Sequence, residues 1–324
     1  MKYIDFHCDT LCSAFLQQKK ELALTENTMI NLEKLKAGEC AAQFFAIYMM
    51  PEEDKVVSGV QIPDDDTYIS SLHGILNESI KNSDTLAFCR SYDEMIENGK
   101  NGKISAFLTL EDGRAVRGSM EKLEKFYEMG VRLISLTWNF INCFGYPNSL
   151  DAKIMSKGLT DFGKDAVRRM NELGMFVDVS HLSDGGFYDV ADISTRPFIA
   201  SHSNCRSIAP HQRNLTDEMI RILADKGGLA GLNFCPRFIH ENVENEHSTA
   251  KLIAKQASYM ANCGGIEVVG IGTDFDGITG VLEVDGPDKM HLLWDALKAE
   301  GFSEAEIEKI AWKNAERIIK DVLR

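Results

Sequence analysis

The chain begins with the stretch Tyr3-Ile4-Asp5-Phe6-His7-Cys8-Asp9, a short and largely apolar run that ends in a histidine and a carboxylate. Four further hydrophobic runs end in the same way, on Glu111, His181, His202 and Asp274. Core packing does not explain metal-ligand side chains at the ends of five predicted strands. Strands of one ring present their carboxyl ends to a common mouth, so we expect these side chains to converge on one site.

Hydrophobic runs of this kind recur along the whole sequence. Most are continuous, as expected of parallel strands that are buried on both faces. The predicted strands are residues 3–9, 41–49, 104–112, 131–139, 175–181, 197–203, 227–235 and 267–275. The amphipathic helices expected between them include residues 120–127, 164–173, 217–226 and 250–260. Three of these helices would end at glycines, namely Gly130, Gly174 and Gly227. This repetition predicts a (β/α)8 TIM barrel that forms a single domain over residues 1–324.

Three segments lie outside this repeat. Residues 303–324 begin with a capping-box pattern, Ser303 to Glu306, and are expected to form one amphipathic helix on the outside of the barrel. Residues 50–66 and 142–160 are expected to be long loops above the mouth, because they carry turn-forming residues and no helical or strand periodicity.

Composition limits the partners and the compartment. The formal net charge is -14, with 35 Lys and Arg against 49 Asp and Glu, so there is no basic excess to bind nucleic acid or an anionic membrane. Eight cysteines without any Cys-x-x-Cys pair indicate reduced thiols. No leader-like segment is visible, and no apolar run reaches the roughly 20 residues of a membrane span. We therefore expect a cytoplasmic protein.

The pair His7 and Asp9 introduces the metal hypothesis. Residues two apart on a strand project from the same face, so both side chains can bind one ion. Alone, the pair is better explained as a core histidine beside a buried carboxylate. His181 and His202 change this balance, because each closes an apolar strand and is followed by residues that start a helix. Mixed imidazole and carboxylate ligands suit zinc, with manganese, cobalt or iron as alternatives.

The number of ligands indicates two ions. Three histidines and at least two carboxylates exceed the needs of one catalytic zinc, and two ions bridged by a carboxylate fit better. Glu111 is the natural bridge, since the side chain of Asp112 would point to the opposite face of the strand. The alternative is that Glu111 is only an acid of a turn or a helix start.

Asp274 and Arg213 are candidates for the chemistry and for substrate binding. Asp274 could accept a proton from a metal-bound water, whereas an ordinary Asp-Gly turn explains Asp276 better. Arg213 would lie in the loop after the sixth strand, where its guanidinium could bind a substrate carboxylate through two hydrogen bonds. From spacing alone, a solvated surface arginine explains it nearly as well.

The ordered set of motifs resembles the renal, or membrane, dipeptidase family of binuclear zinc metallopeptidases, which belongs to the amidohydrolase-like barrels. The resemblance covers essentially the whole chain. The motifs that carry it are Phe6-His7-Cys8-Asp9, Leu110-Glu111-Asp112-Gly113, Val179-Ser180-His181, Ala200-Ser201-His202-Ser203, Gln212-Arg213-Asn214 and residues 270–277. It implies that His7 and Asp9 hold one zinc and that His181 and His202 hold the other. Glu111 would then bridge the two ions.

The same resemblance implies roles around the metals. Arg213 would bind the free carboxylate of a dipeptide, Asp274 would transfer the proton, and a D-residue at the C-terminal position would be tolerated. The chain departs from the family at Trp138, in Leu136-Thr137-Trp138-Asn139, where relatives carry a histidine that polarises the scissile carbonyl. An indole donates one hydrogen bond and carries no charge, so Asn139 or a metal ion would have to take over that task.

These observations together predict hydrolysis of small dipeptides by a hydroxide shared between two zinc ions, with Asp274 as proton acceptor and donor. One alternative is another amidohydrolase reaction on the same metals, on a lactone, a cyclic imide or a related amide. Such barrels usually begin with His-x-His and bridge their metals with a carboxylated lysine. A non-catalytic barrel is a weaker alternative, because a residue able to bind metal or transfer a proton stands at every expected position. Neither nucleic acid nor a membrane is an expected partner, and a homodimer is compatible with the sequence.

Overall fold

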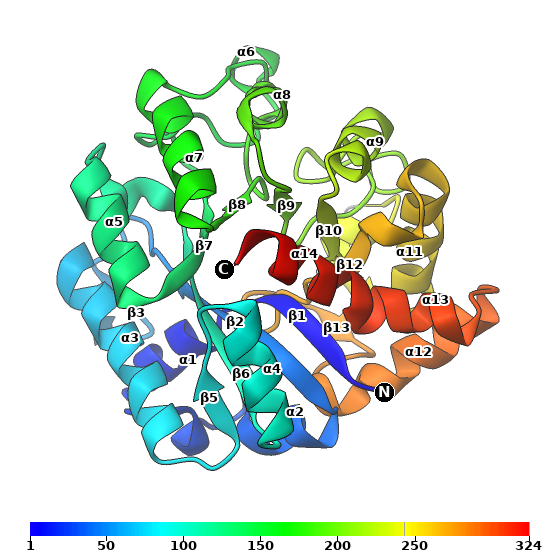
Figure 1. Cartoon of the computed structure of the whole chain (residues 1–324), viewed down its shortest axis with the longest axis horizontal. Coiled ribbons are helices and arrows are strands. Elements are labelled where there is room, and N and C mark those ends of the chain that lie inside the picture. The colour runs from blue at the N-terminus through cyan, green and yellow to red at the C-terminus, as the bar shows by residue number, and fades with distance from the viewer. Residues whose placement is uncertain (243, 324) are drawn as a thin grey trace.

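The fold of the computed structural model, which describes residues 1–242 and 244–323, is a closed parallel barrel (Figure 1). Neighbouring strands follow the order β1, β2, β6, β7, β8, β9, β10 and β12, and β12 pairs with β1 to close the ring. Their bounds are β1 Tyr3–Cys8, β2 Cys40–Tyr48, β6 Ile104–Glu111, β7 Val131–Ser135, β8 Phe176–Asp178, β9 Ile199–Ala200, β10 Leu229–Leu232 and β12 Val269–Ile271. The predicted (β/α)8 barrel is thus confirmed.

Several strands end earlier than the apolar pattern suggested. β7 ends at Ser135 instead of residue 139, and β12 ends at Ile271 instead of residue 275. The backbone of His181 and of Asp274 has left-handed φ angles of 69° and 64°, which a strand cannot accommodate. These side chains therefore lie in the first loop residues beyond the strands.

Helices surround the barrel (Figure 1). They are α1 Thr10–Leu16, α2 Leu32–Ala37, α3 Asp65–Lys81, α4 Tyr92–Lys100, α5 Met120–Met129, α6 Ala152–Met155, α7 Asp161–Leu173, α8 Asp184–Ile193, α9 Asp217–Asp225, α10 Pro236–Ile239, α11 Ala250–Gly264, α12 Met290–Ala299, α13 Glu304–Glu308 and α14 Asn314–Val322. Short 3-10 segments are η1 Leu22–Leu24, η2 Gly113–Val116, η3 Ile266–Val268 and η4 Pro287–Lys289. The expected helices correspond to α5, α7, α9 and α11. Gly130 and Gly174 cap α5 and α7 with positive φ, and Gly227 follows α9 with a φ of 70°.

Some elements were not expected from the sequence. β5, Leu86–Phe88, pairs with the beginning of β6, and β5 and α4 together form an insertion between α3 and β6. The predicted loop at residues 50–66 contains the hairpin β3 Val56–Val57 and β4 Val60–Gln61, and the loop at residues 142–160 contains α6. A further short pair joins β11 His247–Ser248 to β13 Val281–Leu282. Among the described residues, no helix combines the length and the apolar character needed to cross a membrane.

The C-terminal tail closes one end of the barrel. It starts with the predicted capping box, then continues through α13, a π-helical turn η5 (Lys309–Lys313) and α14. The sequence did not specify which part of the barrel exterior the tail covers, and the structure places α14 across the amino-terminal end of the barrel (Figure 1). Its residues Ile318, Ile319 and Val322 are fully buried with interior strand residues such as Phe6 and Phe44. The apolar barrel interior needs a cover at this end, and the apolar face of α14 supplies it. Arg324, the end of the predicted tail, lies outside the described residues.

We expect Ile319→Ala to lower the free energy of unfolding by about 2–5 kcal/mol, the usual loss when a buried Ile becomes Ala. Ile319 is fully buried in the cluster that joins α14 to the barrel. Urea unfolding followed by circular dichroism measures this change. The exposed neighbour Lys320 provides the control, because Lys320→Ala should change stability by no more than about 0.5 kcal/mol. Equal stabilities of the two variants would contradict the role of α14 as a cover.

Candidate metal centre

Glu111, the last residue of β6, lies at the centre of the histidine and carboxylate cluster and is only 3% exposed. Its two carboxylate oxygens face different partners. Oε1 is 3.0 Å from His181 Nε2 and 3.5 Å from His202 Nε2. Oε2 is 3.4 Å from His7 Nε2. One carboxylate thus connects two groups of imidazoles, as a bridging ligand would.

Two more carboxylates complete the side of the cluster around His7. Asp9 follows β1 and stands at the start of α1, with Oδ2 3.5 Å from His7 Nε2. Asp274 follows β12 and has Oδ1 3.7 Å from the same nitrogen. The cluster contains three overlapping groups whose ligand atoms lie within 4.8 Å of one another. They are His7, Asp9 and Glu111; Glu111, His181 and His202; and His7, His202 and Asp274.

Hydrogen bonds on the far side of two rings fix their orientation. His202 Nδ1 lies 2.7 Å from Ser201 Oγ, and this hydroxyl donates to Asp178 Oδ2 at 2.6 Å. The imidazole N–H therefore donates to the hydroxyl oxygen. His181 Nδ1 donates to Asn139 Oδ1 at 3.2 Å. Both rings then present an unprotonated Nε2 towards Glu111, the form that binds a metal ion.

Burial is the largest influence on the pKa values of the cluster. Burial, and the positive charge of Arg213 or His7, lower the pKa of His181 and His202 well below the usual range. Burial also raises the pKa of Glu111 and Asp274, although His7 opposes this change. For His7 itself, burial lowers the pKa, but Glu111 and Asp9 together raise it well above the usual value. The cluster therefore stabilises positive charge and keeps two imidazoles neutral.

These residues fit a pair of metal ions. The Nε2 atoms of His181 and His202, both without a proton, lie only 3.0 Å apart, an arrangement that a cation between them would stabilise. His7 Nε2 and Asp9 Oδ1 are buried and lack a hydrogen-bond partner among the described residues. Buried polar atoms without partners are costly unless a ligand satisfies them. Asp112 lies outside the cluster, where its Oδ1 accepts hydrogen bonds from Arg114 N–H and Asn142 Nδ2, while its Oδ2 is also buried without a partner among the described residues.

Arg213 lies inside this site and is 6% exposed, which excludes the solvated surface arginine. Its Nη1 donates to Ser203 Oγ at 3.2 Å, and its Nη2 donates to the carbonyl oxygen of His202 at 3.4 Å. Its Nε has no partner among the described residues. The guanidinium consequently retains donors for an anionic ligand.

Asp274 is held by Asn233, whose Nδ2 donates to its Oδ2 at 2.8 Å. This leaves Oδ1 directed to His7. The left-handed φ of Asp274 is a conformation that costs about 1–3 kcal/mol in non-glycine residues and is concentrated at functional sites. The structure thus orients this carboxylate at some cost in stability.

Trp138 borders the cluster from the loop after β7. Its ring centroid is 6.2 Å from that of His181 and 5.1 Å from that of Tyr48, with a T-shaped contact to Tyr48. Phe140 extends this aromatic row, at 5.8 Å from Trp138, and is 43% exposed. Asn139 is exposed and contacts the cluster through its hydrogen bond to His181.

Sequence reasoning missed several residues that orient the site, namely Asp178, Ser201, Asn233 and Tyr48. Each lies at or near the carboxyl end of a predicted strand, and this position was the only available signal. Single polar residues in such positions do not form a recognisable pair or spacing. Their roles become visible only when the strands are placed side by side.

Buried imidazoles and carboxylates that converge at the carboxyl end of a (β/α)8 barrel define a metal-dependent hydrolase of the amidohydrolase-like class. The family model of membrane dipeptidases (peptidase family M19) matches residues 1–324. The chain belongs to this metallopeptidase family.

Individual proteins are similar to the chain in sequence or in fold. The chain is 34% identical over 235 residues to an uncharacterised protein of Klebsiella pneumoniae, covering 70% of this chain and 86% of that protein. It is 27% identical over 326 residues to a dipeptidase of Claviceps purpurea, covering 99% of this chain and 73% of that protein. The fold is also that of a metallopeptidase from Rhodobacter sphaeroides liganded with a phosphinate mimic of L-Ala-D-Ala. That comparison has a TM-score of 0.86, 23% identity and 99% coverage of both chains.

Proposed function

We propose that this metal-dependent hydrolase is a zinc dipeptidase that cleaves dipeptides with a free C-terminal carboxylate and accepts a D-residue at that position. The observation that carries the proposal is Glu111, whose two oxygens face His7 on one side and His181 with His202 on the other. Arg213, buried beside His202, supplies the positive charge for the terminal carboxylate. The dipeptide mimic bound by the Rhodobacter sphaeroides relative supports the same substrate class.

His7 and Asp9 would hold one ion, His181 and His202 the other, and Glu111 both. Two zinc ions would supply a hydroxide nucleophile near neutral pH and polarise the scissile carbonyl. Asp274 would accept the proton of the nucleophile on Oδ1 and return it to the leaving amine, while Asn233 keeps Oδ2 in place. The buried positions of these groups strengthen their electrostatic effect on the reacting atoms.

A small substrate panel tests the proposal. Zinc-loaded protein should bind about two ions per chain and hydrolyse L-Ala-L-Ala and L-Ala-D-Ala, with activity lost on chelation and restored by zinc. Elemental analysis and a ninhydrin assay for released amino acids measure these properties. Tight binding of only one ion with full activity would refute the binuclear site. Turnover of lactones or cyclic imides without any turnover of dipeptides would favour the alternative amidohydrolase reaction.

The place of Trp138 beside the metal ligands leads to a separate prediction. Trp138 cannot supply the charged donor of an imidazolium, and loss of one such donor typically costs about 2.7–4 kcal/mol of transition-state stabilisation. We therefore expect Trp138→His to raise kcat on L-Ala-L-Ala by about tenfold or more. Trp138→Phe, which keeps the aromatic contact with Tyr48 but loses the N–H, should show no such gain. Unchanged kcat in Trp138→His with intact metal content would show that carbonyl polarisation does not depend on this position.

Other predictions from the sequence stay predictions. They are the zinc identity of the metal, the cytoplasmic location, the single domain over residues 1–324 and a homodimer.

A further inference from the structure

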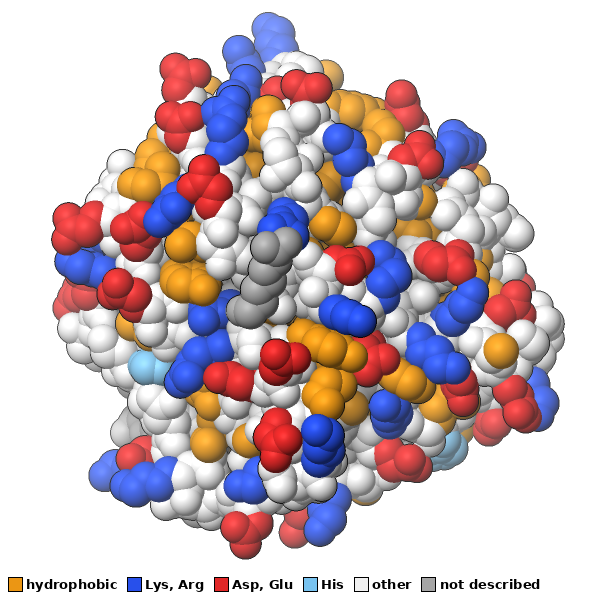
Figure 2. Space-filling model, in the orientation of Figure 1, with side chains coloured by type: hydrophobic (Ala, Val, Ile, Leu, Met, Phe, Trp, Pro, Cys, Tyr) orange, Lys and Arg blue, Asp and Glu red, His pale blue; other side chains and the backbone are white. Residues whose placement is uncertain are grey.

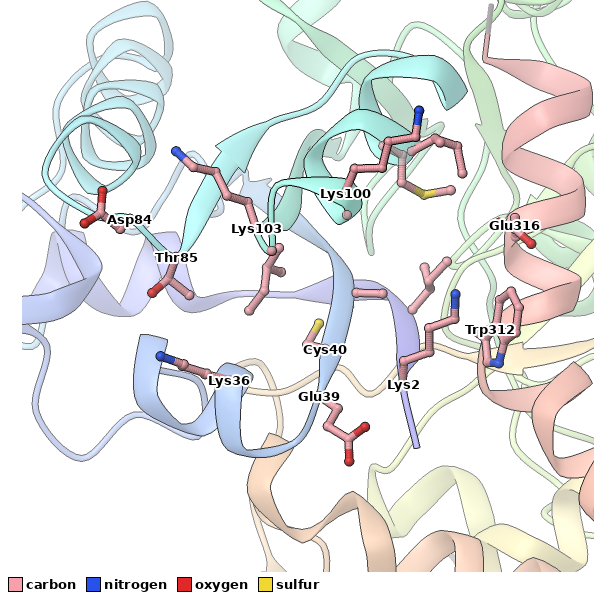
Figure 3. A pocket seen from close by; sticks show the side chains of 17 residues that line it. Lys2, Lys36, Glu39, Cys40, Asp84, Thr85, Lys100, Lys103, Trp312 and Glu316 are labelled. Carbon is pink, nitrogen blue, oxygen red and sulfur yellow. The ribbon is translucent and has the colours of Figure 1, made fainter.

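A cavity of about 840 Å³ lies at the amino-terminal end of the barrel strands (Figure 3). Its lining includes Ile4 at the start of β1, Ala41 at the start of β2 and Ile104 at the start of β6. The carboxyl ends of β1 and β6 carry His7 and Glu111, so the cavity is remote from the proposed dipeptide site. Its volume falls within the range of about 300–1,000 Å³ that is usual for small-molecule sites.

The walls of this cavity are built by elements that a (β/α)8 barrel does not require. Met95 and Ile96 come from α4, part of the insertion between α3 and β6. Trp312 comes from the π-helical turn η5, which interrupts the C-terminal helix. π-helical turns are rare in proteins, and those that occur often lie at functional sites. Two independent additions to the fold thus meet at one cavity.

Lysines surround the apolar part of the cavity. Lys2, Lys36, Lys100 and Lys103 line it together with the acids Glu39, Asp84 and Glu316 (Figure 3). On the same face, side chains of both charges, Lys and Arg as well as Asp and Glu, lie around hydrophobic side chains near the centre of the view (Figure 2).

The charges at this cavity are incompletely compensated. Glu39 is engaged by the N-terminal ammonium at 3.0 Å, and Lys100 pairs with Glu97 at 3.7 Å. Lys2, Lys36 and Lys103 have no carboxylate partner in the described part of the chain, and the lining acids Asp84 and Glu316 likewise have no basic partner there. The unpaired lysines thus exceed the unpaired acids by one, and Lys2 is the lysine whose position is fixed.

The ammonium of Lys2 has a defined position at the edge of the cavity. Its Nζ lies 3.5 Å from the centroid of the Trp312 ring, a cation–π contact that restrains the side chain (Figure 3). A negatively charged group at this edge would meet a restrained positive charge, while an apolar group would reach Met95 and Ile96. The two halves of the cavity therefore complement the two halves of an amphipathic anion.

We propose that this cavity is a second ligand site, which binds a small organic anion with an apolar, ring-sized body. The anionic group lies beside Lys2, whose ammonium is held over Trp312, and the body packs against Met95 and Ile96. The site is separate from the proposed peptidase reaction and does not depend on it.

Fluorescence titration of the zinc-loaded protein with anilinonaphthalene sulfonate, an aromatic anion, tests the proposal. We expect saturable binding with one site per chain. The variant Lys2→Gln should raise Kd by about tenfold or more, because one charge-assisted contact is usually worth about that factor. Lys251→Gln, which removes the same charge from the exposed face of α11, is the matched control and should leave Kd unchanged.

A steric variant tests the cavity without changing its charge. Gly99 lies in α4 and lines the cavity, and a Cβ built there meets no atom within 4 Å. Gly99→Leu should therefore fold normally, since leucine is favoured over glycine in helices, and should weaken probe binding by about tenfold or more. Naphthylamine, the ring without the sulfonate, and inorganic sulfate should each compete more weakly than the intact anion. Lack of saturable binding, or a Kd that neither Gly99→Leu nor Lys2→Gln changes, would overturn the proposal.

Discussion

Glu111→Gln is expected to abolish most of the metal binding and to lower kcat/KM by at least about a hundredfold. Glu111 is the one residue whose two oxygens face both imidazole groups, so its replacement affects both proposed ions. A neutral amide provides only one acceptor oxygen and no charge between two dications. Removal of an outer partner of a metal ligand already costs about 10–100-fold in affinity or activity. Elemental analysis and dipeptide turnover measure the two losses.

The same variant should have opposite effects on stability with and without metal. Burial raises the pKa of Glu111 in the folded protein, so its ionised form destabilises the metal-free fold at pH values above the unfolded pKa. Gln carries no charge and removes this penalty, so metal-free Glu111→Gln should be at least as stable as the metal-free parent. With zinc present, the parent should be the more stable protein, because ligands that bind only the folded state stabilise it. Thermal unfolding with and without zinc separates these cases.

Asp112→Asn is the matched control, since this neighbouring acid accepts hydrogen bonds from Arg114 and Asn142 and lies outside the cluster. We expect it to keep the metal content and most of the activity. Equal metal loss in both variants would mean that the acidic pair acts through the fold and that Glu111 is not the bridge.

The position of the metal centre could be predicted because a closed barrel of parallel strands fixes where the residues at the strand ends lie. Once β1, β6 and β12 are parallel strands of one closed ring, the residues at their carboxyl ends face the same mouth. The hydrophobic runs gave the strands, and the polar residue after each run gave a candidate ligand. The strand ends themselves were less accurate, because the apolar pattern continues into loop residues that pack on the core, such as Leu136 and Phe275.

Loop conformations and packing partners could not be predicted in the same way. The loop after β9 has no periodicity, so only the structure shows that Arg213 turns inward to Ser203 while Arg206 turns outward to Asp184. The amphipathic pattern of α14 indicates that one face of the helix is buried, but it does not indicate which part of the protein covers that face. The insertion of β5 and α4 was likewise missed, because three residues of strand are too few to be distinguished from a loop.

Arg213→Ala is expected to lower kcat/KM for dipeptides by one to three orders of magnitude. The reason is the loss of a buried, charge-assisted contact to the terminal carboxylate, worth about 1.5–3 kcal/mol or somewhat more when the pair is desolvated. Arg213→Lys keeps the charge but loses the planar fork and should recover only part of the activity. C-terminally amidated dipeptides, which lack the carboxylate, should be poor substrates for the parent and should lose little further activity in Arg213→Ala.

Arg206→Ala is the matched control for this experiment, because Arg206 lies on the same loop and forms two 2.7 Å hydrogen bonds with Asp184. This variant should lose stability without losing the preference for acid over amide substrates. The preference is the decisive measurement, since a general disturbance of the loop would lower turnover of both substrates equally. If the parent protein hydrolyses acid and amide substrates at equal rates, Arg213 does not bind the terminal carboxylate. Its buried guanidinium would then serve the packing of the loop through Ser203 and the carbonyl oxygen of His202.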